Sequence, residues 1–543
     1  MHTPAGADVG QTPFVLLLLS TLALAQELLD HEHLVRVDVP DHPDALATSR
    51  HGSLLAAPPT DGTPWRDAPL PETDEGTGSY VAWEALDALD VQPWHDAGYT
   101  GQGVKIAVFD LGWYPLSSWQ DELGDVETHD CQAHERCTTP MDDLRPRFEY
   151  EVNLHGIGCA ETIRDIAPDA ELHLVRANGL TTFENAVSWA VREEIDFISM
   201  SLSFFGNSFY DGTGPVAARV EELAAGDVLL ATSAGNYATE HFHDGFADRD
   251  GDDRHDMPDG GDLLWVEWGA GGRKVSLNWD NYFRCGDTDL DLLVVDSDGD
   301  VVGRSQDVQE PGDDLCVPVE KLRVEVPSRG LYGIAVERAG GDPDVRFDLF
   351  ARGGEVVGGD PSRTIVDPAV HPLAMAVGAV RAVDYLENPI EFFSSQGPTH
   401  GGLAKPDISG PDGLTTGVYG PTGFYGTSAS TPAVVGAMAL IASRSPELSP
   451  FEVAAKAQAW AVGAGGATWE APDTVFGAGK LRLPDPELLG GCLSGGASAW
   501  LLAPLCWGLG RRRALLFKDG EALPMTRWWA PVDPGPACGH RRG

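Results

Sequence analysis

Short, nearly continuous apolar runs alternate with helically periodic segments in two stretches of this chain. The apolar runs and helical patterns of the first stretch are, in chain order, 104–109, 172–175, 183–194, 197–200, 216–225 and 228–231. Strands that are apolar throughout are typical of a parallel sheet covered on both faces. The alternation therefore predicts an α/β fold, with a doubly wound, mainly parallel sheet flanked by helices.

A different pattern interrupts this alternation over residues 244–359. Residues 245–260 are dominated by Asp and Gly, and residues 263–350 contain short strands separated by Gly, Asp and Pro turns. Such spacing is typical of a β-sandwich. The α/β pattern resumes afterwards, so we predict an all-β sandwich inserted at a loop between the two parts of one α/β domain, residues 83–243 and 360–485.

The N-terminal residues have the pattern of an export signal. An apolar run at 14–19 continues to Ala23-Leu24-Ala25, a small-residue cleavage signature. This pattern predicts a signal peptide over residues 1–25, and hence a secreted or cell-surface protein. Residues 26–82 show little periodicity, which indicates a pro-segment or linker.

The C-terminal tail, residues 486–543, contains Gly491-Cys492, an apolar stretch at 497–509 and a cluster of three arginines at 511–513. The apolar stretch is shorter than the roughly 20 residues of a membrane-spanning helix. The order of these features resembles the short C-terminal sorting signals of some Gram-negative bacteria. That resemblance implies membrane or envelope anchoring, and an amphipathic chain end is the alternative.

Composition limits the partners of the chain. Its 83 acidic and 37 basic residues give a net charge of -46, while 42% hydrophobic and 22% charged residues are typical of a globular protein. Such a surface repels phosphate groups, so we expect no nucleic-acid partner. It suits solubility, calcium binding or a salty medium, and composition does not decide among them.

Eight cysteines fit an oxidising compartment without indicating a dense disulfide scaffold. Cys131 with Cys137, and Cys285 with Cys316, are local pairs that could close loops by disulfides. A set with the spacing of zinc ligands is His129, Cys131, His134 and Cys137. No finger-like pattern flanks this set, which favours a disulfide or free thiols in a loop.

Three polar residues lie at positions where α/β proteins commonly have functional residues, namely the end of a strand and the starts of helices. Asp110 ends the first strand, at the carboxyl edge of the predicted sheet, and His155 begins a helix. Ser428 lies in a Gly-flanked segment directly before an apolar helix, where free N–H groups and the helix dipole stabilise negative charge. Taken singly, each residue is more often a cap, a turn former or a structural side chain. Their joint occurrence indicates a nucleophile with a base and a group that orients the base.

These segments resemble the subtilisin-like serine protease family (subtilases, peptidase S8), in which the catalytic residues follow in the order Asp, His, Ser. The further matching segments are 199–202, 231–236, 393–398 and 405–407. The resemblance covers roughly residues 90–243 and 360–485. It implies that Ser428 attacks the peptide carbonyl, His155 transfers the proton and Asp110 orients the imidazole. It also implies that Asn236 donates to the oxyanion.

The same resemblance implies a strand that binds substrate backbone. The substrate-binding residues that it implies are Ser201, Leu202, Ser203 and Gly235. The family usually has Ser-Leu-Gly at this strand end, whereas here Ser203 is followed by Phe204 and Phe205. We expect these three residues to narrow or reshape the primary specificity pocket.

The insert resembles the pre-peptidase C-terminal type of β-sandwich, in the segments 277–280, 287–292 and 330–333. Before it, Asp248, Asp250 and Asp252 alternate as at the start of an EF-hand calcium loop, but the twelfth position is Asp259 instead of Glu. Structural calcium and a solvated turn remain equal alternatives at this place. No cofactor is expected for the chemistry itself.

The sequence thus predicts a secreted or surface-anchored serine endopeptidase that acts as a monomer on protein or peptide substrates through an acyl-enzyme. One alternative is a catalytically weak surface protein that uses the sandwich for binding. Another is a processing protease of narrow specificity.

Overall fold

The computed structural model of the chain describes residues 37–38, 81–131, 136–137, 154–177, 179–281, 288–309, 317–341, 344–463 and 473–490. The predicted signal peptide, His134, Cys285, Cys316 and the apolar stretch of the tail lie outside these residues. The chain divides into two compact units, Met1–Asp485 and Pro486–Gly543, and the first contains all the sheets. The described part of the second contains a single 3₁₀ turn, Leu488–Gly490.

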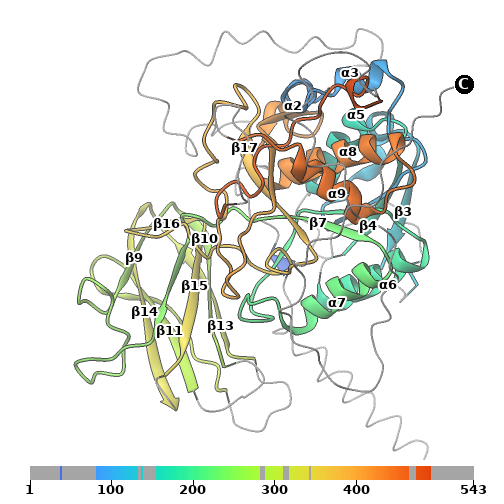
Figure 1. Cartoon of the computed structure of the whole chain (residues 1–543). Coiled ribbons are helices and arrows are strands. Elements are labelled where there is room, and N and C mark those ends of the chain that lie inside the picture. The colour runs from blue at the N-terminus through green and yellow to red at the C-terminus, as the bar shows by residue number, and fades with distance from the viewer. Residues whose placement is uncertain are drawn as a thin grey trace, which may run out of the picture. The chain divides into compact units, whose positions relative to one another are not determined.

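Seven strands form a central sheet in which all the neighbouring strands run parallel (Figure 1). In the order in which they lie side by side, the strands are β18 (Ile408–Asp412), β17 (Met375–Arg381), β7 (Leu229–Ser233), β5 (Phe197–Met200), β2 (Lys105–Asp110), β4 (Glu171–Arg176) and β3 (Val126–Asp130). In β2, every residue after the first is buried, as a sheet covered on both faces requires. The predicted parallel α/β fold is confirmed.

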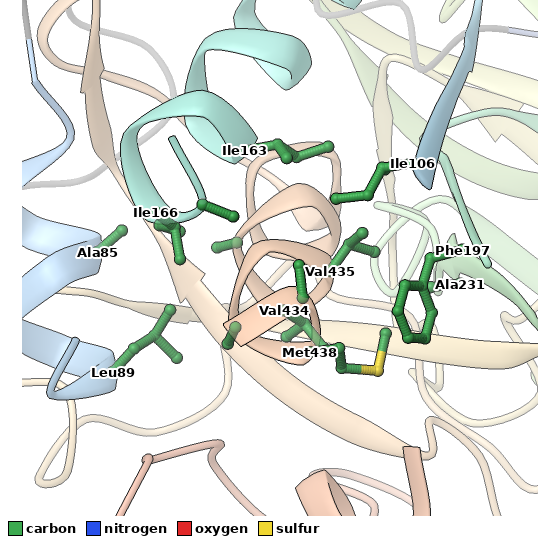
Figure 2. Close-up of a cluster of buried hydrophobic side chains, with 14 of the residues drawn as sticks. Ala85, Leu89, Ile106, Ile163, Ile166, Phe197, Ala231, Val434, Val435 and Met438 are labelled. Carbon is green, nitrogen blue, oxygen red and sulfur yellow. The ribbon is translucent and has the colours of Figure 1, made fainter. Parts of the chain in front are cut away.

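Helices cover both faces of this sheet. The helices are α2 (Trp83–Leu89), α3 (Gln92–Asp96), α4 (Gln120–Leu123), α5 (His155–Ile166), α6 (Leu180–Arg192), α7 (Gly214–Ala225), α8 (Thr427–Arg444) and α9 (Pro450–Ala459). Ile106 and Val108 of β2 pack in one hydrophobic cluster with α5 and α8, whereas Ala107 and Phe109 pack in another with α6 and α7. Alternate side chains of one strand therefore pack against helices on opposite faces of the sheet, as in a doubly wound fold. Figure 2 shows part of the first cluster, with Val434, Val435 and Met438 of α8 among side chains of the sheet.

Nine strands between β7 and β17 in the chain form two antiparallel sheets (Figure 1). The first has the order β13 (Val319–Val326), β10 (Gly271–Trp279), β15 (Arg346–Arg352), β8 (His241–Gly245). The second has the order β12 (Val301–Ser305), β11 (Thr288–Val295), β14 (Gly330–Gly341), β9 (Leu264–Trp268), β16 (Gly354–Val356). Side chains from both sheets, including Trp268 and Trp279, share one hydrophobic core, as in a β-sandwich. The resemblance to the pre-peptidase type and the exact domain boundaries stay predictions.

The four-stranded sheet makes polar contacts with the segment that follows β5. Asn278 Nδ2 donates to Ser208 O at 3.2 Å, and Lys321 Nζ donates to Phe205 O at 3.0 Å. The guanidinium of Arg352 lies 4.8 Å from the ring centre of Phe205 and 4.5 Å from that of Tyr237. The sandwich is therefore joined to the loops beside the predicted site.

Four short strands form two further antiparallel pairs. β1 (Val37–Asp38) pairs antiparallel with β6 (Ser203–Phe204). β19 (Leu414–Thr416) and β20 (Gly420–Phe424) form a hairpin that leads into α8. Within the described ranges, none of the helices has the length and apolar character needed to span a membrane.

Candidate active site

Asp110 ends β2 in the middle of the parallel sheet, and its side chain is fully buried. One carboxylate oxygen, Oδ1, accepts from the backbone N–H groups of Leu111 at 2.7 Å and Gly112 at 2.8 Å. The other, Oδ2, lies 2.7 Å from His155 Nδ1. A carboxylate only accepts, so this contact places the ring proton on Nδ1 and a lone pair on Nε2. The backbone fixes the carboxylate, and the carboxylate fixes the imidazole.

His155 begins α5, and the glycine after it allows the helix to approach β2 closely. A Cβ atom at Gly156 would lie 2.8 Å from Asp110 Cβ and 2.9 Å from two ring carbons of Trp113. Trp113 in turn donates its indole N–H to Asp110 O at 3.0 Å. Glycine is therefore needed directly after His155, because a side chain at position 156 would prevent the close packing that brings His155 to Asp110.

Ser428 is the second residue of α8 and is 3% exposed. The helix begins after Gly426, whose φ of 99° is a conformation that favours glycine. A Cβ atom at Gly426 would also lie 2.9 Å from Asn236 Nδ2, so this position has no room for a side chain. The predicted nucleophile therefore sits at a tight turn into a buried helix, close to Asn236.

The backbone carbonyl of Ser428 has donors that the sequence analysis missed. Pro432 lies one turn later and has no N–H, so the usual helical hydrogen bond to Ser428 O cannot form. Instead Ser201 Oγ donates to Ser428 O at 3.1 Å, and Cys159 Sγ lies 3.6 Å from it. The proline was a signal that this carbonyl needs another donor, but it does not say which residue supplies it.

Asn236 is oriented by the residue that precedes Ser428. Its Oδ1 accepts from Thr427 N at 3.0 Å and from Thr427 Oγ1 at 2.9 Å. Both contacts require the amide oxygen on that side, so Nδ2 is the donor on the other side. Gly235, with a φ of 107°, donates its N–H to Thr427 Oγ1 at 3.3 Å and keeps the loop against α8.

The residues predicted to bind substrate lie next to this site, with their side chains directed into the fold. Ser201 donates to α8, Leu202 is fully buried in a core cluster, and Ser203 pairs with β1. A role in substrate binding would therefore fall to their backbone. Phe204 and Phe205 are also fully buried, in two separate clusters, and the expected reshaping of a specificity pocket stays a prediction.

The predicted calcium ligands come together in the structure. Carboxylate oxygens of Asp248, Asp250 and Asp252 lie within 4.8 Å of one another. Asp248 Oδ1 also accepts from Gly251 N at 2.7 Å and from Asp252 N at 3.2 Å, which is the geometry of an ordinary turn. Calcium at this place stays a prediction.

Glu161 is a buried carboxylate of α5 that the sequence analysis did not single out. It is 3% exposed, and Val418 N donates to its Oε2 at 3.4 Å. Burial raises the pKa of Glu161 from its ordinary 4.5 to about 8, and the nearby carboxylates Glu122 and Asp165 add to this rise. The folded protein therefore keeps this proton at pH values where the unfolded chain has lost it.

Replacing Glu161 with glutamine should make the protein more stable than the wild type at pH 8 and not at pH 4. The folded pKa lies above the unfolded one, so the wild type loses stability as the pH rises from about 4.5 to 8, by on the order of a few kcal/mol. Chemical denaturation at several pH values measures the difference. Glu355→Gln, an exposed change on β16, is the control. A constant difference across this range would contradict the shift.

The parallel sheet, the Asp110–His155 pair and the serine at the start of α8 match the arrangement of the subtilisin-like serine protease class. The sequence model of the Subtilase family matches residues 319–479. Over 145 residues, 26% of this chain, the sequence is 30% identical to the membrane-bound transcription factor site-1 protease of Homo sapiens, covering 13% of that protein. Over 181 residues, 31% of this chain, it is 29% identical to the minor extracellular protease Vpr of Bacillus subtilis, covering 21% of it.

Among solved structures, the CspB protease of Clostridium perfringens superposes with a TM-score of 0.50 at 15% identity. The superposition covers 75% of this chain and 99% of that one, and it shows the shared fold. The matched segments are a small part of the two curated relatives, about an eighth and a fifth of their length. The predicted resemblance to the subtilisin-like serine protease family is confirmed by the family match over residues 319–479 and by the shared fold.

Proposed function

We propose that the chain is a serine endopeptidase that cleaves peptide bonds through an acyl-enzyme on Ser428. The observation that carries the proposal is the 2.7 Å contact between Asp110 Oδ2 and His155 Nδ1 at the carboxyl edge of the sheet. His155 lies at the start of α5, and α5 packs against α8, the helix that contains Ser428. An oriented imidazole beside a serine at a helix start is what nucleophilic catalysis needs.

In the proposed reaction His155 Nε2 takes the proton of Ser428 Oγ as that oxygen attacks the substrate carbonyl. The same nitrogen then gives the proton to the leaving amine, and a water molecule hydrolyses the ester by the reverse sequence. Asp110 holds the imidazole in the tautomer that can accept the proton. Asn236 Nδ2 and the N–H groups at the start of α8 stabilise the oxyanion.

The substrate is proposed to be an extended protein or peptide segment that pairs with β6. The antiparallel pairing of Val37–Asp38 with Ser203–Phe204 supports this, because it shows that a short extended segment fits beside the strand. Backbone pairing of this kind gives affinity without demanding a particular side chain.

We further propose that the protein is exported, acts as a monomer and needs no cofactor for the chemistry. The similarity to Vpr, a minor extracellular protease, and the apolar N-terminal run support export. Calcium at Asp248, Asp250 and Asp252, and anchoring through the tail, are proposed as structural additions.

Labelling with a fluorophosphonate probe tests the proposal, because the probe reacts with activated serines. We expect the mature protein and the control Ser430→Ala, a buried change in the same helix, to be labelled, and Ser428→Ala to remain unlabelled. Mass spectrometry of the labelled peptide identifies the modified residue. Absence of labelling in the mature protein, or equal labelling of Ser428→Ala, would exclude Ser428 as the nucleophile.

A further inference from the structure

Two histidines and a glutamate come together on the edge strand β3 and its neighbour β4, outside the proposed catalytic residues. Glu127 and His129 point to one face of β3, and His173 lies opposite Glu127 on β4. The exposed Glu127 lies at the protein surface, whereas His129 is half-buried and His173 is buried. The register of the two strands thus gathers three possible metal ligands.

The distances within this group fit a single ion. His129 Nε2 lies 3.2 Å from His173 Nδ1, and Glu127 Oε2 lies 3.7 Å and 3.6 Å from these two nitrogens. Ligand atoms bound tetrahedrally at about 2.0–2.1 Å are roughly 3.3–3.4 Å from one another. The three atoms therefore need to move by only a few tenths of an ångström to coordinate a common ion.

The remaining ring nitrogens have acceptors that select the tautomers needed for metal binding. His173 Nε2 lies 3.0 Å from Glu171 Oε1, and His129 Nδ1 lies 3.3 Å from Cys137 O. Each acceptor favours a proton on the nitrogen that it contacts, which leaves the lone pairs of His129 Nε2 and His173 Nδ1 facing each other. Two facing lone pairs repel unless a cation lies between them.

The surroundings hold the rings in place and leave the site open to solvent. The ring of Trp189, on α6, lies 4.3 Å from His129 and 5.6 Å from His173, measured between ring centres. Cys137 is tied to Cys131 by a disulfide, which fixes the carbonyl that orients His129. Glu127 is exposed and, with Glu171, lines a surface pocket of about 510 Å³, so water can reach the site from the side of this carboxylate.

We propose that Glu127, His129 and His173 form a binding site for a divalent transition metal, with Zn(II) as the expected occupant. Two imidazoles and one carboxylate suit zinc, whereas calcium prefers oxygen ligands alone. The site differs from the zinc-like spacing in the sequence, because Cys131 and Cys137 form a disulfide and only His129 is shared. A bound ion would link β3 to β4 beside the disulfide-bonded Cys137.

Titration of the chelator-treated full chain with Co(II) tests the site, because nitrogen-ligated tetrahedral Co(II) absorbs strongly in the visible range. We expect one equivalent of such a spectrum in the wild type, displaced by Zn(II). His129→Gln should abolish it, and Glu127→Gln, an exposed change, should weaken binding at least about tenfold. Glu171→Ala, which removes the acceptor of His173, should weaken it by about 10–100-fold.

The matched control is Glu325→Gln, an exposed carboxylate of the sandwich, which should bind Co(II) as the wild type does. Circular dichroism confirms that each variant is folded. A wild type without the tetrahedral spectrum, as expected if the two rings share a proton instead, would overturn the proposal. An unchanged spectrum in both Glu127→Gln and His129→Gln would overturn it equally, because the metal would then be bound elsewhere.

Discussion

Replacing Asp110 with asparagine should lower kcat by about 10⁴-fold while the fold is retained. The backbone N–H groups of Leu111 and Gly112 bind Oδ1 at 2.7 and 2.8 Å, so they would hold the amide oxygen of asparagine in the same place. Its NH₂ group would then face His155 Nδ1 and donate to it. The ring proton would move to Nε2, and His155 could no longer accept the proton of Ser428.

Steady-state kinetics on a peptide substrate measures this loss, with thermal unfolding as the check on folding. Asp196→Asn provides the matched control, because Asp196 Oδ2 accepts from Lys105 N at the opposite end of β2. It makes the same chemical change beside the same strand and should leave kcat within about twofold. If Asp110→Asn retained wild-type kcat, His155 would not depend on the carboxylate for its tautomer.

Much of the fold follows from local sequence, because each of the inner strands β2, β4, β5 and β7 contains a short, nearly continuous apolar run. β2, β4, β5 and β7 were all predicted in this way. β3 was not, since Val126–Asp130 contains a single apolar residue. It lies at the edge of the sheet and exposes part of one face, so its pairing with β4 depends on tertiary context. Two of the polar side chains that make β3 unrecognisable as a strand from sequence, Glu127 and His129, belong to the proposed metal site.

The reactive residues could be predicted, but most of the contacts that orient them could not. Asp110, His155 and Ser428 each stand in a recognisable local segment. The contact of Ser201 with Ser428 joins residues 227 positions apart, and that of Asn236 with Thr427 joins residues 191 apart. Sequence periodicity cannot predict such long-range contacts, because the residues are brought together only when the sheet packs against α8.

The sandwich adds a connection that the sequence did not suggest. Phe350 of β15 packs edge-on against Tyr237, with ring centres 5.8 Å apart, and Arg352 lies over the same ring. Arg352 also pairs with Glu240 at 3.3 Å. Tyr237 directly follows Asn236, so the inserted sheet supports the loop that holds the proposed oxyanion donor. This support is a reason for Asn236 to be rigid, which is what electrostatic stabilisation of a transition state requires.

Replacing Asn236 with alanine should lower kcat by about 10²–10³-fold with little change in KM. The loss falls on kcat because the amide donates to a charge that exists only in the transition state. Asn236 also has a structural contact, since its Oδ1 accepts from Thr427 N and Oγ1. A fall in activity alone would therefore not separate the catalytic role from the structural one.

Asn236→Asp separates the two roles. Aspartate keeps an oxygen that can accept both hydrogen bonds from Thr427, but it replaces the Nδ2 donor with a second oxygen. If Asn236 is the oxyanion donor, aspartate should be at least as inactive as alanine, because a negative charge would then face the developing oxyanion. If the amide only fastens the loop to α8, aspartate should restore the thermal stability lost in the alanine variant and restore kcat with it. Recovery of kcat in Asn236→Asp would therefore contradict the oxyanion role, whereas recovery of stability without activity is the result we expect.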